Sequence, residues 1–148
     1  MTDRHEHDSL REGAALGVIV ATGIWLWLAV VDALAGQPFR TFHVLGGTAL
    51  FTVLHVALCL AYGVVATAFV HGARREPSLI IGAALAFLLL QFAFAMIAAL
   101  LSHVGLGGLA WVRILGGNLV GAALTLLVLS RRHPLRDELR QAERAETE

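Results

Sequence analysis

Three polar side chains share one face of a helix inside an apolar stretch of the chain. His55, Cys59 and Tyr62 follow one another at i, i+4 and i+7, the spacing that aligns side chains on a helix. An imidazole, a thiol and a phenol in line could relay protons or bind a polar solute. They could equally form a polar seam whose hydrogen bonds fix helix packing. We favour the seam, because no carboxylate or second imidazole lies at the depth of His55.

Two amides, Gln91 and Asn118, lie in other apolar runs of the sequence. We estimate the depth of each of these residues and of His55 by counting from the end of its run on the side of the termini, at about 1.5 Å per residue. On this count, the depths of His55, Gln91 and Asn118 agree within roughly 5 Å. Polar side chains are rare and costly inside a bilayer, so each is a candidate for function. The sequence therefore predicts a mid-membrane polar site of His55, Gln91 and Asn118, with Cys59 and Tyr62 beside it.

A second candidate cluster comprises Asp32, His43, His103 and Arg113, which lie at the ends of the apolar runs. Two histidines and a carboxylate at one depth could hold a divalent metal, and paired histidines could ligate haem. Alternatively, the residues are hydrated, Asp32 pairs with Arg40 or Arg113, and Arg113 extends outward toward the membrane surface. We assign no metal ligand and no cofactor to this cluster.

The sequence contains none of the common catalytic signatures. No GxGxxG, GxxxxGK[ST], HExxH or GxSxG pattern is present, and these patterns are the usual grounds for nucleotide, zinc-protease or serine-hydrolase chemistry. No Asp or Glu lies deep within an apolar run either, since Asp32 falls at the end of the first one. We therefore expect a protein that is not an enzyme and assign no catalytic residue.

The composition indicates a membrane protein. Of 148 residues, 57% are hydrophobic and 15% are charged, whereas soluble domains carry about 25% charged residues; the mean hydropathy is +0.74. Eleven acids balance eleven bases, so the basic excess typical of nucleic-acid binding is missing. The single cysteine, Cys59, excludes an internal disulfide and any multi-cysteine metal site.

Four apolar runs, at about 13–35, 44–70, 79–102 and 109–130, are each close to or above the roughly 20 residues that a spanning helix needs. Breaker residues separate them: Gly36-Gln37-Pro38, the charged stretch 71–78 and the glycine-rich stretch 103–111. The sequence predicts an all-α protein, a bundle of four transmembrane helices over 13–131. A cleaved signal peptide is the alternative for the first run, although signal cores are usually about 7–15 residues long.

The two ends of the chain are polar. Residues 1–12 lack apolar periodicity and are expected to form a mobile polar tail. Residues 132–148 carry Leu135, Leu139 and Ala142 at helical spacing, which favours either a short amphipathic helix at the membrane surface or a frayed charged tail. With four spans, nine arginines fall on the side of the termini and only Arg40 and Arg113 on the other. The positive-inside rule then predicts that both termini are cytoplasmic. The layout resembles that of bacterial four-helix membrane proteins, so we expect the chain in the inner (plasma) membrane of a bacterium.

An internal similarity suggests two tandem parallel helical hairpins. Residues 42–48 (FHVLGGT) resemble residues 112–118 (VRILGGN) at a separation of seventy, and Gly13-Ala14-Ala15-Leu16 recurs as Gly82-Ala83-Ala84-Leu85 at a separation of sixty-nine. Internal repeats are common in membrane proteins. In so apolar a chain, chance similarity is the competing explanation, and both remain open at this point.

These features lead to three hypotheses. The first is a non-enzymatic structural or accessory membrane subunit that contacts lipid and associates with itself or with other membrane subunits, through small-residue faces such as Gly117 and Gly121. The second is a transporter or binding module for protons or a small solute, which uses the mid-membrane His/Gln/Asn site. The third is metal or haem binding at the outer cluster.

Overall fold

The computed structural model describes residues 3–73 and 78–132, and within these ranges the chain is helical without a strand. It has four long helices: α1 (Asp3–Leu34), α3 (Thr48–Ala73), α4 (Ser78–Leu101) and α5 (Ala110–Arg132). A short helix, α2 (Arg40–Val44), lies between α1 and α3. Two short helical turns, η1 (Ser102–Leu106) and η2 (Gly107–Leu109), join α4 to α5.

Three described stretches are long and apolar enough to cross a membrane: Leu10–Leu34, Thr48–Val70 and Leu85–Arg131. The last stretch begins within α4 at Leu85, continues through the reversal at η1 and η2, and ends within α5 at Arg131. The prediction of an all-helical protein built on long apolar helices is confirmed.

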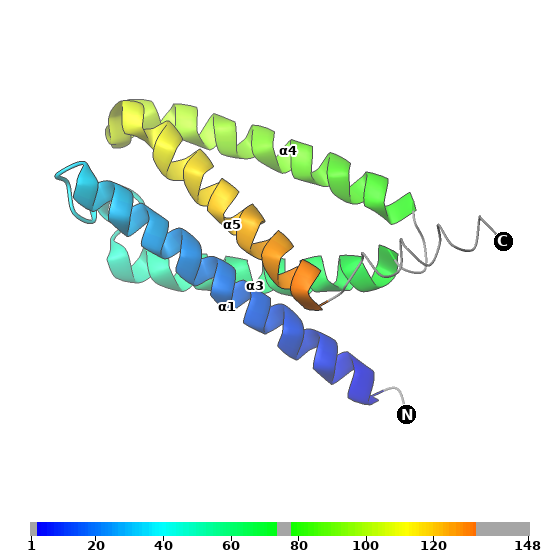
Figure 1. The fold of residues 1–148 in the computed structure, drawn as a ribbon. Helices are drawn as coiled ribbons and strands as arrows, with labels where there is room; N and C mark the ends of the chain where they lie inside the picture. The colour runs from blue at the N-terminus through cyan, green and yellow to red at the C-terminus, as the bar shows by residue number, and fades with distance from the viewer. Residues whose placement is uncertain (1–2, 74–77, 133–148) are drawn as a thin grey trace.

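The helices run side by side, with α1 packed against both α3 and α5. Helix α4 lies on the side of α5 away from α1 (Figure 1). The N-terminal end of α1 and the C-terminal end of α5 lie together at one end of the molecule. The opposite end, which we call the turn end, is formed by residues 35–47 and 102–109.

Glycines allow α1 and α3 to approach each other at backbone distance. A Cβ atom on Gly13 would lie 2.6 Å from Cα of Val64, and one on Gly63 would collide with the backbone of Gly13 and Gly17. Gly13 and Gly17 form a small-xxx-small pair, the arrangement that permits such contacts between membrane helices. The buried core, consisting of Leu16, Val20, Ala21 and Cys59, lies along this interface.

The other small-xxx-small pair, Gly117 and Gly121, is buried inside the chain. Ideal Cβ atoms on these glycines would lie 3.4 Å and 2.9 Å from side-chain atoms of Ile24 on α1. The hypothesis that this pair offers a face for self-association is therefore wrong. Its role is to let the large side chains of α1 pack closely on α5.

Replacement of Gly63 by alanine is expected to destabilise the protein by about 1–3 kcal/mol, because the added methyl group overpacks a backbone contact. Gly82→Ala is the matched control, since a Cβ there has nothing within 4 Å. In that open helical position alanine is expected to stabilise by up to about 1 kcal/mol. Thermal unfolding in mild detergent measures both. Equal effects of the two substitutions would show that α1 and α3 are not in backbone contact.

Two expectations about element bounds need correction. The polar segment 3–12, expected to be a tail without regular structure, is part of α1, because its Glu, Arg and Leu residues favour helix and continue the apolar helix that follows. The second apolar run begins at residue 44, but α3 begins at Thr48, after α2 and a tight turn. Residues 74–77 and the amphipathic helix expected within 132–148 lie outside the described residues, apart from Arg132 at the end of α5.

The two copies of the internal similarity adopt different structures. Residues 42–48 form the end of α2 and the turn into α3, where Gly46 and Gly47 have φ values of 101° and 96°. The matching residues 112–118 lie within the continuous helix α5. Gly13 also packs against α3, whereas its counterpart Gly82 has no neighbour within 4 Å. These differences favour chance similarity over two equivalent hairpins.

Candidate functional site

The turn end holds a fully buried ion pair. The Asp32 and Arg113 side chains are both 0% exposed, and Nε of Arg113 donates to Oδ1 of Asp32 at 2.7 Å. The carboxylate also accepts hydrogen bonds from the backbone N–H and the hydroxyl of Thr41, at 2.7 Å and 2.8 Å. Three donors therefore occupy the two oxygens of Asp32.

Arg113 also fastens the reversal between α4 and α5. Its Nη1 donates to the carbonyl oxygen of Leu106 at 2.9 Å. The guanidinium therefore joins the end of α1, η1 and the start of α5, and Asp32 adds helix α2 through Thr41. The expectation that Arg113 extends outward to the surface is wrong. Its hydrogen-bond donors find acceptors inside the protein, apart from Nη2, which is buried without a hydrogen-bond partner.

The chain between Asp32 and Thr41 is shaped by two residues with positive φ. Gly36 (φ 67°) ends α1, as glycine commonly does at a helix C-terminus. Phe39 also has positive φ, at 59°, a rare conformation for a bulky residue that typically stores about 1–3 kcal/mol of strain. It starts α2 at an angle that brings Thr41 back to Asp32.

Aromatic side chains continue from the turn end toward the interior. Phe42 is fully buried, and its ring lies 5.0 Å from Trp25, 5.7 Å from Phe39 and 5.1 Å from Phe51, centroid to centroid. The Phe51 ring in turn stacks on the imidazole of His55 at 5.1 Å. A series of packed rings thus extends from Phe42, the residue after Thr41, to His55.

His55 is held by α1 and by its own helix. Its Nε2 lies 3.2 Å from the carbonyl oxygen of Ala21, and Sγ of Cys59 lies 3.8 Å from Nε2. An imidazole that donates to a backbone carbonyl and stacks on a ring serves helix packing. This supports the interpretation of His55 and Cys59 as a polar seam between α1 and α3.

The remaining residues of the expected mid-membrane site bond elsewhere. Nδ2 of Asn118 donates to Oε1 of Gln91, which joins α5 to α4. The hydroxyl of Tyr62 donates to Oγ1 of Thr125 at 3.2 Å, which joins α3 to α5. The five residues of the expected site are therefore divided among three interhelical contacts. His55 is not hydrogen-bonded to either amide in the described structure; its partner is the carbonyl group of Ala21.

The outer cluster is likewise divided. Asp32 and Arg113 are buried together, whereas His43 and His103 are exposed. Among the described residues, no group of three His, Cys, Asp or Glu side chains is placed to hold a metal ion. Since its oxygens already accept from Thr41 and Arg113, Asp32 does not complete a metal site with the two histidines.

Comparisons with protein-family models, with curated proteins and with solved structures found no match to this chain. Its function must therefore be argued from its own residues.

Sequence reasoning missed several partners in these contacts. Thr41 and the carbonyl group of Leu106 complete the ion pair, and Thr125 accepts from Tyr62. A threonine nine residues after an aspartate gives no local signal, because their contact depends on the turn between them. Buried threonine in an apolar helix, as at position 125, is a weak sign of an interhelical hydrogen bond.

Proposed function

We propose that this protein is a non-enzymatic structural or accessory subunit that crosses the membrane four times. The stretch Leu85–Arg131 supports four spans, because a straight helix of 47 residues would extend about 70 Å, more than twice the hydrocarbon core. The reversal at η1 and η2 instead separates two helices, α4 of 24 residues, which begins before this stretch at Ser78, and α5 of 23 residues. The excess of arginine on the side of the termini supports a cytoplasmic location for both, and the membrane that we propose is the inner membrane of a bacterium.

The observation that carries the proposal is the narrow contact of α4 with the rest of the chain. From Gln91 onward, its less exposed positions recur at helical spacing and form one stripe, at 91, 94, 95, 98, 99 and 101. Before Gln91, all six positions from Leu85 to Leu90 are exposed. Leu88, Leu89 and Leu90 are all exposed, although they point about 100° apart around the axis.

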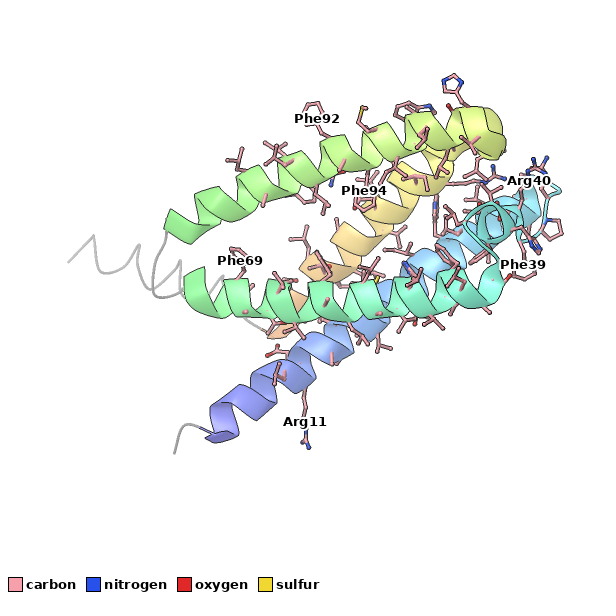
Figure 2. All side chains as sticks on the ribbon, turned by 180° about the vertical axis from the view of Figure 1, so that it is seen from behind. Arg11, Phe39, Arg40, Phe69, Phe92 and Phe94 are labelled. Carbon is pink, nitrogen blue, oxygen red and sulfur yellow. The ribbon has the colours of Figure 1, made fainter. Side chains whose placement is uncertain are left out.

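Helix α3 has no stretch that is exposed on all sides. Between Phe51 and Val70, exposed and less exposed positions alternate at helical periodicity, as expected of a helix with lipid on one side. Figure 2 shows Phe92 of α4 pointing away from the other helices and Phe94 pointing toward them. An apolar helix attached by one stripe leaves faces available for a neighbouring membrane subunit or a second copy.

The polar residues also support a structural role. His55, Gln91 and Asn118 take part in separate interhelical or backbone contacts, which is what packing requires. A transport path would instead need them to face a common polar space.

Photo-crosslinking tests the proposal. A benzophenone side chain at Phe92, which is 72% exposed, is expected to capture protein in intact membranes. The same group at Leu58 on α3, which is 70% exposed, is the matched control and is expected to capture lipid. If both positions yielded only lipid adducts, α4 would have no protein neighbour and the proposal would fail.

A further inference from the structure

A hollow at the turn end is lined by cationic and polar side chains. Its volume is about 570 Å³, and its walls come from the chain after α1, from α2 and from η1, namely Gln37, Pro38, Arg40, His43, Val44, Val104 and Gly105. It lies apart from the buried ion pair and takes no part in the proposed association of α4.

Arg40 is held at this hollow by hydrogen bonds from two of its three guanidinium nitrogens. Its Nε and Nη2 donate to the carbonyl oxygen of Gly105 at 3.1 Å and 2.9 Å. Within the described part of the chain, Nη1 has no recorded partner. A guanidinium anchored by two hydrogen bonds is already oriented, so little side-chain entropy remains to be lost on binding a ligand.

Within residues 3–73 and 78–132, no carboxylate is seen paired with Arg40. Gly105 supplies only a neutral carbonyl group. The one carboxylate between residues 13 and 75 of the sequence is that of Asp32, and its oxygens accept from Thr41 and Arg113. Arg40 therefore presents a full positive charge at the mouth of the hollow.

The other polar groups of the hollow suit an anion. His43 offers at least one ring N–H in either protonation state, and Gln37 offers an amide NH₂. The lining has no carboxylate or thiol, and the guanidinium repels cations. These donors therefore favour the binding of an anion beside His43. They do not favour the metal ion that the sequence analysis considered for His43.

We propose that this hollow binds a phosphate group, that of an anionic phospholipid headgroup at the membrane surface. Arginine forms strong charge-assisted hydrogen bonds with phosphate. Val44 and Val104 give the hollow apolar walls against which the glycerol backbone and first methylene groups of the lipid pack. A soluble phosphate shares the same chemistry, and the experiment separates the two sources.

Native mass spectrometry of the full chain in mixed micelles of phosphatidylglycerol and phosphatidylcholine tests this proposal. The wild type is expected to retain phosphatidylglycerol in preference, and Arg40→Gln to reduce its retention by about ten-fold, the effect of losing a charged hydrogen bond. Arg11→Gln is the control, because Arg11 is also exposed but lies far from the turn end (Figure 2). It is expected to leave retention unchanged.

A second variant and a second probe complete the test. His43→Ala removes a donor that makes no recorded hydrogen bond within the described protein, so it is expected to weaken retention while preserving the melting temperature. Inorganic phosphate is then added at matched ionic strength. If phosphatidylglycerol stays bound, the lipid is the ligand; if phosphate displaces it, the ligand is a soluble phosphate. The proposal is overturned if wild type shows no preference between the lipids and no response to phosphate, or if Arg40→Gln and Arg11→Gln have the same effect on retention.

Discussion

Replacement of Arg113 by methionine is expected to lower the free energy of unfolding by about 3–5 kcal/mol. The substitution leaves the Asp32 carboxylate buried, with Thr41 as its remaining partner, and a buried charge without its counter-ion is strongly destabilising. It also removes the hydrogen bond to Leu106 that fastens the reversal between α4 and α5. Reversible unfolding in mixed micelles, followed by circular dichroism, measures the change.

The double substitution Asp32→Leu with Arg113→Met is the informative partner experiment. Removing both charges removes the desolvation penalty of each, so the double variant is expected to recover much of the stability lost by either single variant. Arg131→Met, at an exposed position near the end of α5, is the control and is expected to change stability by less than about 0.5 kcal/mol. Additive losses in the double variant would argue against a direct ion pair.

Replacement of Phe42 by alanine is expected to destabilise the protein by about 3–5 kcal/mol. Phe42 is 0% exposed and its ring contacts three other aromatic rings, so its removal leaves a cavity at the base of the turn end. Phe92→Ala is the matched control, because Phe92 is 72% exposed and its removal leaves no cavity within the chain.

The same unfolding assay distinguishes the two phenylalanines. The account predicts a loss for Phe42→Ala several times that for Phe92→Ala in micelles of the isolated chain. Comparable losses would mean that the aromatic cluster does not organise the turn end.

The helices could be predicted from the sequence because hydropathy over about 20 residues is a local property. Helix α2 could not, because it depends on Phe39 adopting a positive φ, which bulky residues rarely do. The hydrogen bonds between Thr41 and Asp32 hold that conformation. The helical start of α1 at Asp3 was missed for a different reason: polar helix formers carry no apolar periodicity.

The polar residues of the candidate site could be picked out from the sequence, but the directions of their side chains could not. Counting residues along the helices placed His55, Gln91 and Asn118 at one level, yet side chains at one level can point to different neighbours. His55 contacts Ala21 of α1, whereas the two amides join α4 to α5. The face that a helix turns toward each neighbour depends on packing between segments that are distant in the sequence. The periodicity within one helix does not carry this information.

The glycine contacts show the same limit. Gly13/Gly17 and Gly117/Gly121 carry the same spacing, but the first pair meets a backbone and the second meets side chains. Shape complementarity with the opposite helix decides between these outcomes, and the spacing alone does not.

The central claim is that this chain acts as a subunit whose helix α4 is covered by another protein. Native mass spectrometry of the protein, extracted from its own membrane in a mild detergent, tests it most directly. The account predicts a complex heavier than the 15.8 kDa chain, and loss of that complex when Phe92 is replaced by lysine while the helical content is retained. A solitary chain of 15.8 kDa under these conditions would contradict the account.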